Sequence, residues 1–230
     1  MALLNCAGAE VLTAEIRMPR VGVATADLVV NSETDLAGAL TISTEDGAFS
    51  LKGTASRHGQ FVKRQSLRWT AGADGLGKVI PPKQFLGYTL RTVLTNTLGA
   101  CGETLSPASD SALLSSFLTS WTRLARPAKT ALIELLEAKG ASAWRVLPDG
   151  SVWVAKSEPW PAAPAKPFQV LDWNRSEGWA LLGVEQPFML PGTTIPMDDG
   201  SGNITIQRLS YVVHYVEPKS VRTKVWFEDA

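Results

Sequence analysis

Hydrophobic and polar residues alternate one by one along the first third of the chain. The segment AEVLTAEIRM, residues 9–18, is the clearest example, and similar short runs continue to residue 69 between turn-rich pieces such as Glu45-Asp46-Gly47. Because neighbouring side chains of a strand point to opposite faces, this period of two predicts strands with one buried face. Several short strands at this spacing are typical of a small barrel or sandwich, so residues 1–70 are expected to form a β domain.

The apolar residues adopt helical spacing after Pro81. Three segments carry this spacing, residues 84–102, 110–126 and 128–140, and each is predicted to be a helix. The stretch AWRVLPDGSVWV, residues 143–154, follows the third segment. Its Pro-Asp-Gly centre favours a turn, so these residues are predicted to form a β-hairpin that carries Trp144 and Trp153.

Strand patterning returns in the last third of the chain. Four prolines between Pro159 and Pro167 predict a stiff, extended connector before it. In the penultimate strand, one face is expected to hold Leu209, Tyr211, Val213 and Tyr215. The chain is therefore predicted to be α+β and mainly β, with a first β domain (1–70), a linker, helical insert and Trp hairpin (71–158), and a second β domain (159–230).

Composition and charge narrow the functional classes. The chain has 230 residues, of which 45% are hydrophobic, and its 22 Lys and Arg residues balance 22 Asp and Glu residues. The hydrophobic content and the low net charge argue against a disordered chain. The protein also lacks the positive field that a dedicated nucleic-acid binder carries. No apolar run approaches the roughly 18 residues of a membrane span, and a secretory signal is not expected. Cys6 and Cys101 have no CxxC spacing and are expected to be free thiols in a reducing compartment.

Motifs of nucleotide and metal sites are incomplete. The segment GADGLGKV, residues 72–79, matches the start of a phosphate-binding loop, but Val79 stands where a Ser or Thr would bind Mg²⁺. Pro81 and Pro82 also prevent the helix that such a loop needs, so the segment is interpreted as a glycine-rich linker. His58 and His214 are the only histidines and are far apart in sequence, and the acidic stretch Asp198–Asn203 lacks the order of a calcium loop. No cofactor and no metal site is predicted.

A hydrolytic function is the main alternative that the residues leave open. Glu134 and Glu137 lie three residues apart, on a face expected to be solvated, and nothing distinguishes them as a catalytic pair. The eight tryptophans could form a platform for sugar rings, although packing in a core or an interface explains them as well. The alternative to a structural role is thus a cell-wall glycan-binding or peptidoglycan-degrading tail component.

Two long segments resemble one known family. Residues 128–161, AKTALIELLEAKGASAWRVLPDGSVWVAKSEPWP, are similar to the central segment of baseplate hub proteins from contractile phage tails, with a helix, a Trp-containing hairpin around PDG, and a WP pair. The ending SYVVHYVEPKSVRTKVWFE, residues 210–228, is similar to the last strands of those hubs. The order of β, helical and β regions agrees with the same family, so the resemblance covers essentially the whole chain.

The resemblance implies a structural protein rather than an enzyme. Hubs of this family carry two small tube-type β-barrel domains per subunit and form homotrimers, which adapt the six-fold tail tube to a three-fold central spike. The expected partners are therefore further copies of this chain, the tail tube protein, the central spike protein and the wedge proteins of the baseplate. DNA would pass through the lumen without specific binding. The expected location is the baseplate of the virion, after assembly in the cytoplasm of the bacterial host.

Five residues are the candidates for contacts with partners. Trp144 and Trp153 of the hairpin are interface candidates because Trp buries a large area and carries a polar group. Arg222, Lys224 and Trp226 are the candidates in the last strand, where charged residues alternate beside an aromatic one. An ordinary edge strand explains the last three residues equally well.

Overall fold

The computed structural model describes residues 3–157, 170–174, 176–183, 189–198, 204–218 and 220–228. The predicted proline connector and residues 199–203 of the acidic turn lie outside these ranges. The chain divides into two compact units. Unit 1 consists of Met1–Ser50, Ala55–Thr70 and Pro159–Ala230, and unit 2 consists of Leu51–Thr54 and Ala71–Glu158.

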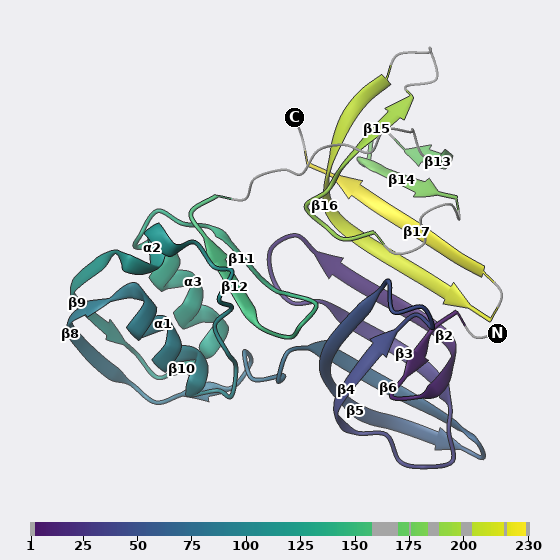
Figure 1. Cartoon of the computed structure of the whole chain (residues 1–230), viewed down its shortest axis with the longest axis horizontal. Coiled ribbons are helices and arrows are strands. Elements are labelled where there is room, and N and C mark those ends of the chain that lie inside the picture. Colours follow the sequence, from purple (N-terminus) through teal and green to yellow (C-terminus); the bar gives the residue numbers. More distant parts are fainter. Residues whose placement is uncertain are drawn as a thin grey trace. The chain divides into compact units, whose positions relative to one another are not determined.

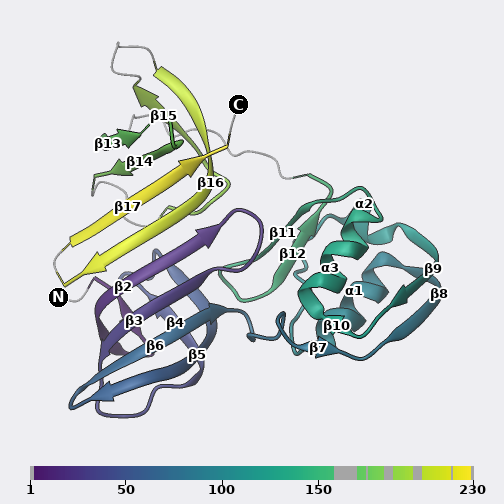
Figure 2. The same ribbon diagram turned by 180° about the vertical axis from the view of Figure 1, so that it is seen from behind.

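Unit 1 is built around one antiparallel sheet, which Figures 1 and 2 show from opposite sides. Its strands are β1 (Asn5–Cys6), β2 (Ala9–Pro19), β3 (Thr25–Asn31), β4 (Gly38–Ser43), β5 (Ser50–Phe61), β6 (Arg64–Ala71), β13 (Val170–Asn174), β14 (Trp179–Leu182), β15 (Thr194–Asp198), β16 (Ile204–Glu217) and β17 (Ser220–Phe227). The strand order is β1-β4-β5-β6-β3-β2-β16-β17-β14-β13, with β15 paired to β16. The mainly β fold expected from the alternating pattern is confirmed.

Two features of the pairing organise this sheet. Strand β1 pairs with both β4 and β2, so the path through β4, β5, β6, β3 and β2 returns to its starting strand. Strand β2 also pairs with β16, from Tyr211 opposite Pro19 to Val216 opposite Ala14. This second pairing joins the N-terminal and C-terminal β regions into one sheet (Figure 2).

The inward side chains of unit 1 follow the alternation in the sequence. Along β3 and β6, every second residue is buried, including Leu28, Leu67 and Trp69. The indole Nε1 of Trp69 donates to the carbonyl of Leu40 at 3.2 Å, so the largest of these core side chains has its polar atom satisfied. Both halves of the chain contribute to this core, because the ring of Phe49 contacts that of His214 edge-on at 6.0 Å.

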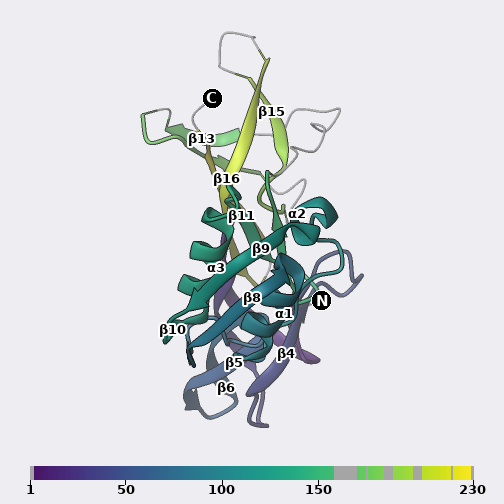
Figure 3. The same ribbon diagram turned by 90° about the vertical axis from the view of Figure 1, so that its left-hand side faces the viewer.

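Unit 2 combines three short helices with three two-stranded pairs. The helices are α1 (Leu90–Gly99), α2 (Ser111–Ser115) and α3 (Ala128–Glu137), and the pairs are β8 (Lys83–Thr89) with β9 (Phe117–Arg123), β7 (Val79–Ile80) with β10 (Arg126–Pro127), and β11 (Ala143–Val146) with β12 (Val152–Ala155). Figure 3 shows β8 beside β9. The predicted third helix and the Trp hairpin are confirmed.

The first two predicted helices are much shorter than expected. Residues 83–89 form β8, and α1 begins only after Thr89, whose hydroxyl accepts the amide of Thr92. Residues 117–123, predicted to be helical, form β9 instead. Aromatic and β-branched residues suit a strand, and Phe85 in β8 packs against Trp121 in β9 with ring centroids 6.0 Å apart. This pairing between distant segments outweighs the helical spacing of their apolar residues.

Candidate interaction surfaces

The glycine-rich loop that resembles a phosphate loop binds a carboxylate of the chain itself. The amides of Ala73 and Gly75 donate to the two carboxylate oxygens of Glu103, at 3.1 and 2.8 Å. Glu103 is only 4% exposed, and a Cβ added at Gly72 would lie 2.6 Å from its Oε2 atom. The amides that could bind an anion therefore donate to a side chain of the same protein. These hydrogen bonds connect residues 72–75 to the segment after α1.

The two tryptophans of the predicted hairpin have different surroundings. Trp144 is 4% exposed and packs in the core of unit 2, with the ammonium of Lys129 5.8 Å from its ring. Trp153 is half-buried, and its Nε1 donates to the carbonyl of Ala108 at 3.1 Å. The guanidinium of Arg145 lies 5.1 Å from the ring of Trp153. Trp144 leaves little surface for a partner, whereas Trp153 and Arg145 offer some, and their role in an interface stays a prediction.

Trp226 and Lys224 belong to an aromatic cluster on three neighbouring strands. Trp179 of β14 lies opposite Trp226 of β17, which lies opposite Tyr211 of β16. The ammonium of Lys224 is 3.7 Å from the ring centroid of Trp179 and 4.9 Å from that of Trp226. Tyr211 packs edge-on against Trp226 at 5.3 Å. We call these four residues the Trp–Lys cluster, and cation–π contacts of this kind hold the lysine against the rings.

Two members of this cluster, Trp179 and Tyr211, were not among the residues predicted to contact partners. Trp179 carries no local signal, because only the register of β14 on β17 places it beside Trp226. The face expected for β16 was also wrong in one position. The register shifts between Leu209 and Tyr211, so Leu209 is fully buried while Tyr211 and Tyr215 remain partly exposed.

A row of charged residues crosses the adjoining strands on the same face of the sheet. Tyr215 lies opposite Glu15, Glu15 opposite Asp27, and Asp27 opposite Arg68, from β16 through β2 and β3 to β6. Arg17 joins this row: its Nη1 donates to Asp27 at 2.6 Å and its Nε donates to Glu15 at 2.9 Å. Arg68 donates to the other oxygen of Asp27 at 2.7 Å. We call Glu15, Arg17, Asp27 and Arg68 the charge row.

The titration of the charge row reflects these contacts. Desolvation raises the pKa of Asp27, but hydrogen bonds from Arg17 and Arg68 outweigh it and hold the pKa below its usual range. Burial raises the pKa of Tyr211 and of Tyr215. The carboxylate of Asp27 is thus ionised, and the two tyrosines stay neutral, over the usual physiological pH range.

Arg222 occupies the same face but makes no such contact. It lies opposite Tyr215 and is exposed, while Lys224 two residues later is half-buried. Among the described residues, no carboxylate forms an ion pair with Arg222. Of the three candidates in the last strand, Arg222 is therefore the most accessible and Lys224 is held by aromatic rings.

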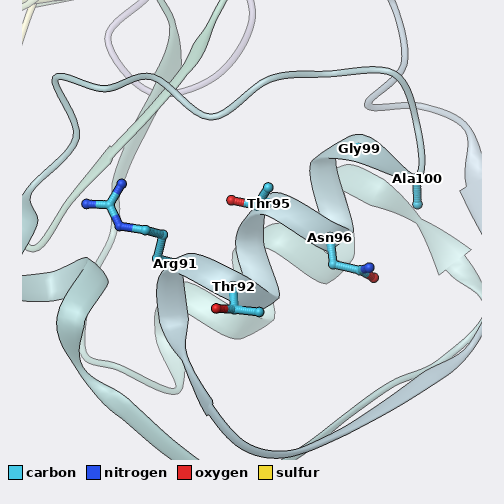
Figure 4. A pocket seen from close by; sticks show the side chains of 6 residues that line it. All are labelled: Arg91, Thr92, Thr95, Asn96, Gly99 and Ala100. Carbon is cyan, nitrogen blue, oxygen red and sulfur yellow. The ribbon is translucent and has the colours of Figure 1, made fainter.

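Two hollows on the described surface do not gather catalytic groups. A hollow of about 610 Å³ runs along α1 and is lined by Arg91, Thr92, Thr95, Asn96, Gly99 and Ala100. Figure 4 shows that these side chains diverge from a single helix, with Arg91 and Asn96 pointing in different directions. A second depression of about 430 Å³ lies on the sheet face beside Glu15, Asp27 and Tyr215. Neither geometry brings a nucleophile to a base.

Several of the other titratable residues considered for a catalytic or metal site are either buried or bonded to residues of the same chain. The buried His214 bonds to the Thr223 hydroxyl and the Met189 carbonyl, each at 2.9 Å, and Glu134 forms an ion pair with Arg126. Cys6 and Cys101 are free and buried, and desolvation raises the pKa of the Cys6 thiol to about 11. The side chain of His58 lies outside the described part of the chain.

The described part of the chain contains neither a cluster of metal ligands nor a helix that could span a membrane. No three His, Cys, Asp or Glu side chains come together there in a group that could bind a metal ion. None of the helices described combines the length and the apolar character needed to cross a bilayer.

Comparisons with known proteins place the fold. No protein-family model matches the sequence, and no curated protein matches it. Among solved structures, a tail protein from Neisseria meningitidis MC58 is similar over 99% of this chain and 96% of its own, with a TM-score of 0.69 and 13% identity. The 43 kDa tail protein of prophage MuSo2 from Shewanella oneidensis is similar over 97% of this chain and 96% of its own, with a TM-score of 0.67 and 8% identity.

A third structure comes from a secretion system. It is an E. coli component of the type VI secretion system, described as structurally similar to the T4 bacteriophage tail proteins gp27 and gp5. The likeness covers 99% of this chain and 76% of that one, with a TM-score of 0.69 and 10% identity. The chain therefore has the fold of phage tail proteins and of this secretion-system component, as the resemblance in its sequence implied.

Proposed function

We propose that this chain is a structural hub of a contractile-tail baseplate, a homotrimer that adapts a six-fold tail tube to a three-fold central spike. The observation that carries the proposal is a likeness in fold to tail proteins over nearly the entire chain. Each copy contributes two β regions to one sheet through the pairing of β2 with β16. Three copies would then present six β modules around an axis, which matches six-fold symmetry above and three-fold symmetry below.

The two β regions are proposed to act as tube-type barrel modules. The strand path that returns to β1 supports this for the N-terminal region. Strands β13 to β17 would form the second module. The outward face of the shared sheet that carries the charge row would line the channel through which DNA passes. A face of this kind suits a conduit because the charges of the charge row are already paired with one another.

Partners follow from the same assembly. Further copies of this chain, the tail tube protein, the central spike protein and the wedge proteins are the proposed partners, in the baseplate of the virion. The half-buried Trp153 and the exposed Arg222 are the candidate contact residues with the most accessible surface. No catalytic role is proposed for any residue.

The solution mass of the purified chain tests the proposal. Light scattering at several protein concentrations should give a constant mass near three times 24.7 kDa. A concentration-independent monomer that stays monomeric with tube and spike proteins added would contradict it. Trp226→Ala should weaken binding to the spike by more than about 1 kcal/mol if Trp226 anchors that contact. Phe61→Ala is the matched control, because Phe61 is an aromatic residue of unit 1 that is 79% exposed on another strand.

The glycan-binding alternative would have to use the Trp–Lys cluster. Sugar rings stack on flat aromatic faces that are free of other contacts. Here the ammonium of Lys224 lies over both indole rings, and all four cluster residues are half-buried. A pull-down with insoluble peptidoglycan distinguishes the two functions, since saturable retention that Trp179→Ala abolishes would favour the glycan-binding module.

A further inference from the structure

We infer that Asp27 and Glu15 prevent the sheet face from binding DNA, because they hold the guanidinium groups of Arg17 and Arg68 in ion pairs. The inference rests on the proposed function, in which DNA passes this face. It assigns a specific role to two carboxylates that belong to no catalytic or metal site. Without them, the same face would present two adjacent arginines to the phosphate backbone.

The contacts leave both oxygens of Asp27 occupied. Oδ2 accepts from Arg17 Nη1 at 2.6 Å and from Arg68 Nη1 at 3.0 Å, while Oδ1 accepts from Arg68 at 2.7 Å. Glu15 Oε1 accepts from Arg17 Nε at 2.9 Å. Strand register produces this geometry, because Glu15, Asp27 and Arg68 lie directly opposite one another on three adjacent strands. Their four charges sum to zero over the row.

Guanidinium groups are the side chains best suited to bind phosphate, since their planar donors match its oxygens in pairs. A carboxylate paired with an arginine offsets its positive charge and repels a phosphate, so it weakens DNA binding even though other donors of the guanidinium remain. The Arg17 and Arg68 side chains are 30% and 44% exposed, so burial does not keep them from a polyanion. The carboxylates are the feature that does so.

Two neighbouring cations of this face, Lys224 and Arg222, determine how strongly the wild-type face attracts DNA. Lys224 lies over the rings of Trp179 and Trp226, whereas Arg222 is exposed without an ion pair among the described residues. A single free arginine gives weak, sequence-independent attraction to DNA. Two more released arginines in the adjoining rows would convert that attraction into measurable binding.

The variant Asp27→Asn tests the inference because it keeps the shape of the side chain and removes its charge. We expect a short fluorescent DNA duplex to bind the variant more tightly than the wild type at about 50 mM salt. The plot of log K against log salt should steepen by about one to two, one for each released arginine, which is about 4- to 16-fold more affinity lost between 50 and 200 mM salt.

Glu33→Gln is the matched control. Glu33 pairs with Lys63 at 2.7 Å at an exposed site of unit 1, so its substitution changes the net charge by the same amount away from the charge row. Glu15→Gln is a second variant that releases only Arg17 and should produce the smaller effect. Adding Arg17→Gln and Arg68→Gln to Asp27→Asn should return binding to the wild-type level. Circular dichroism on each sample verifies that the fold is kept.

Three results would overturn the inference: tight binding with a steep salt slope in the wild type, no gain in folded Asp27→Asn and Glu15→Gln, or an equal gain in Glu33→Gln. The mass measured on the same samples separates this inference from the proposed function. A monomer whose Asp27→Asn variant gains DNA binding keeps the role of the carboxylates and contradicts the hub. A trimer whose variants gain nothing does the reverse.

Discussion

Replacing Glu103 by Ala should destabilise unit 2 through the loop at residues 72–75. Two backbone amides, those of Ala73 and Gly75, would lose their acceptor. A buried donor left without a partner costs about 1–3 kcal/mol. The Gly75 contact is buried and lies at the upper end of that range, while the Ala73 contact is partly exposed and water replaces it at smaller cost. The expected loss in the free energy of unfolding is therefore about 2–4 kcal/mol.

Hydrogen exchange resolves this prediction better than a global melt, because the chain has two compact units that need not unfold together. The amides of Ala73 and Gly75 should exchange faster in Glu103→Ala, and the urea transition of unit 2 should move to lower denaturant. Glu103→Gln keeps one acceptor oxygen and should lose about half as much stability. Glu137→Ala removes an exposed carboxylate of the same unit and should change stability by less than about 0.5 kcal/mol. Unchanged exchange at residues 73 and 75 in Glu103→Ala would refute the reasoning.

Three further predictions follow from single positions. Gly75→Ala should destabilise unit 2 by more than about 2 kcal/mol, since its Cβ would lie 2.1 Å from the Cys101 carbonyl oxygen, whereas Gly77→Ala has open space around it and should be tolerated in the same urea titration. Val62→Gly should increase the free energy of unfolding of unit 1 by up to about 1 kcal/mol, because Val62 holds a positive φ of 53° at the β5–β6 turn. The urea midpoint of unit 1 should rise accordingly, and an unchanged or lower midpoint would count against strain there. Asp27 has a lowered pKa, so it contributes stability above its unfolded pKa of about 4 that is lost as the pH falls through its folded pKa. With a side chain 45% exposed, that contribution is a few tenths of a kcal/mol, and the stability of Asp27→Asn should fall slightly less between about pH 7 and pH 3 than that of the wild type.

Local patterns predicted the elements that depend on local physics. The strands at residues 9–19 and 25–31 follow from alternation, and the third helix follows from its apolar stripe between Pro127 and Gly140. The hairpin of Trp144 and Trp153 follows from its Pro-Asp-Gly turn. In each case neighbouring residues in the sequence decide the structure, so the pattern suffices.

The predictions were wrong where contacts between distant segments decide the structure. Phe85 and Trp121 fit a helical stripe as well as a strand, and their mutual contact across β8 and β9 decides for the strand. The bulge before Tyr211 shifts Leu209 to the core, and no residue type in that segment predicts the bulge. The burial of Trp144 likewise depends on what the rest of unit 2 packs against it.

Apart from β8, β9 and the bulge in β16, the sequence by itself determined which strand residues face a core. It also determined where the turns lie, and that no complete nucleotide or metal motif is present. Only the tertiary structure decided how those faces combine. The pairing of β2 with β16 brings Glu15 opposite Tyr215, two hundred residues away, and the register of β2, β3 and β6 assembles the charge row. The physical reason is that periodicity records the inside and outside of a strand, whereas the choice of neighbour and register depends on packing and hydrogen bonds between segments far apart in the chain.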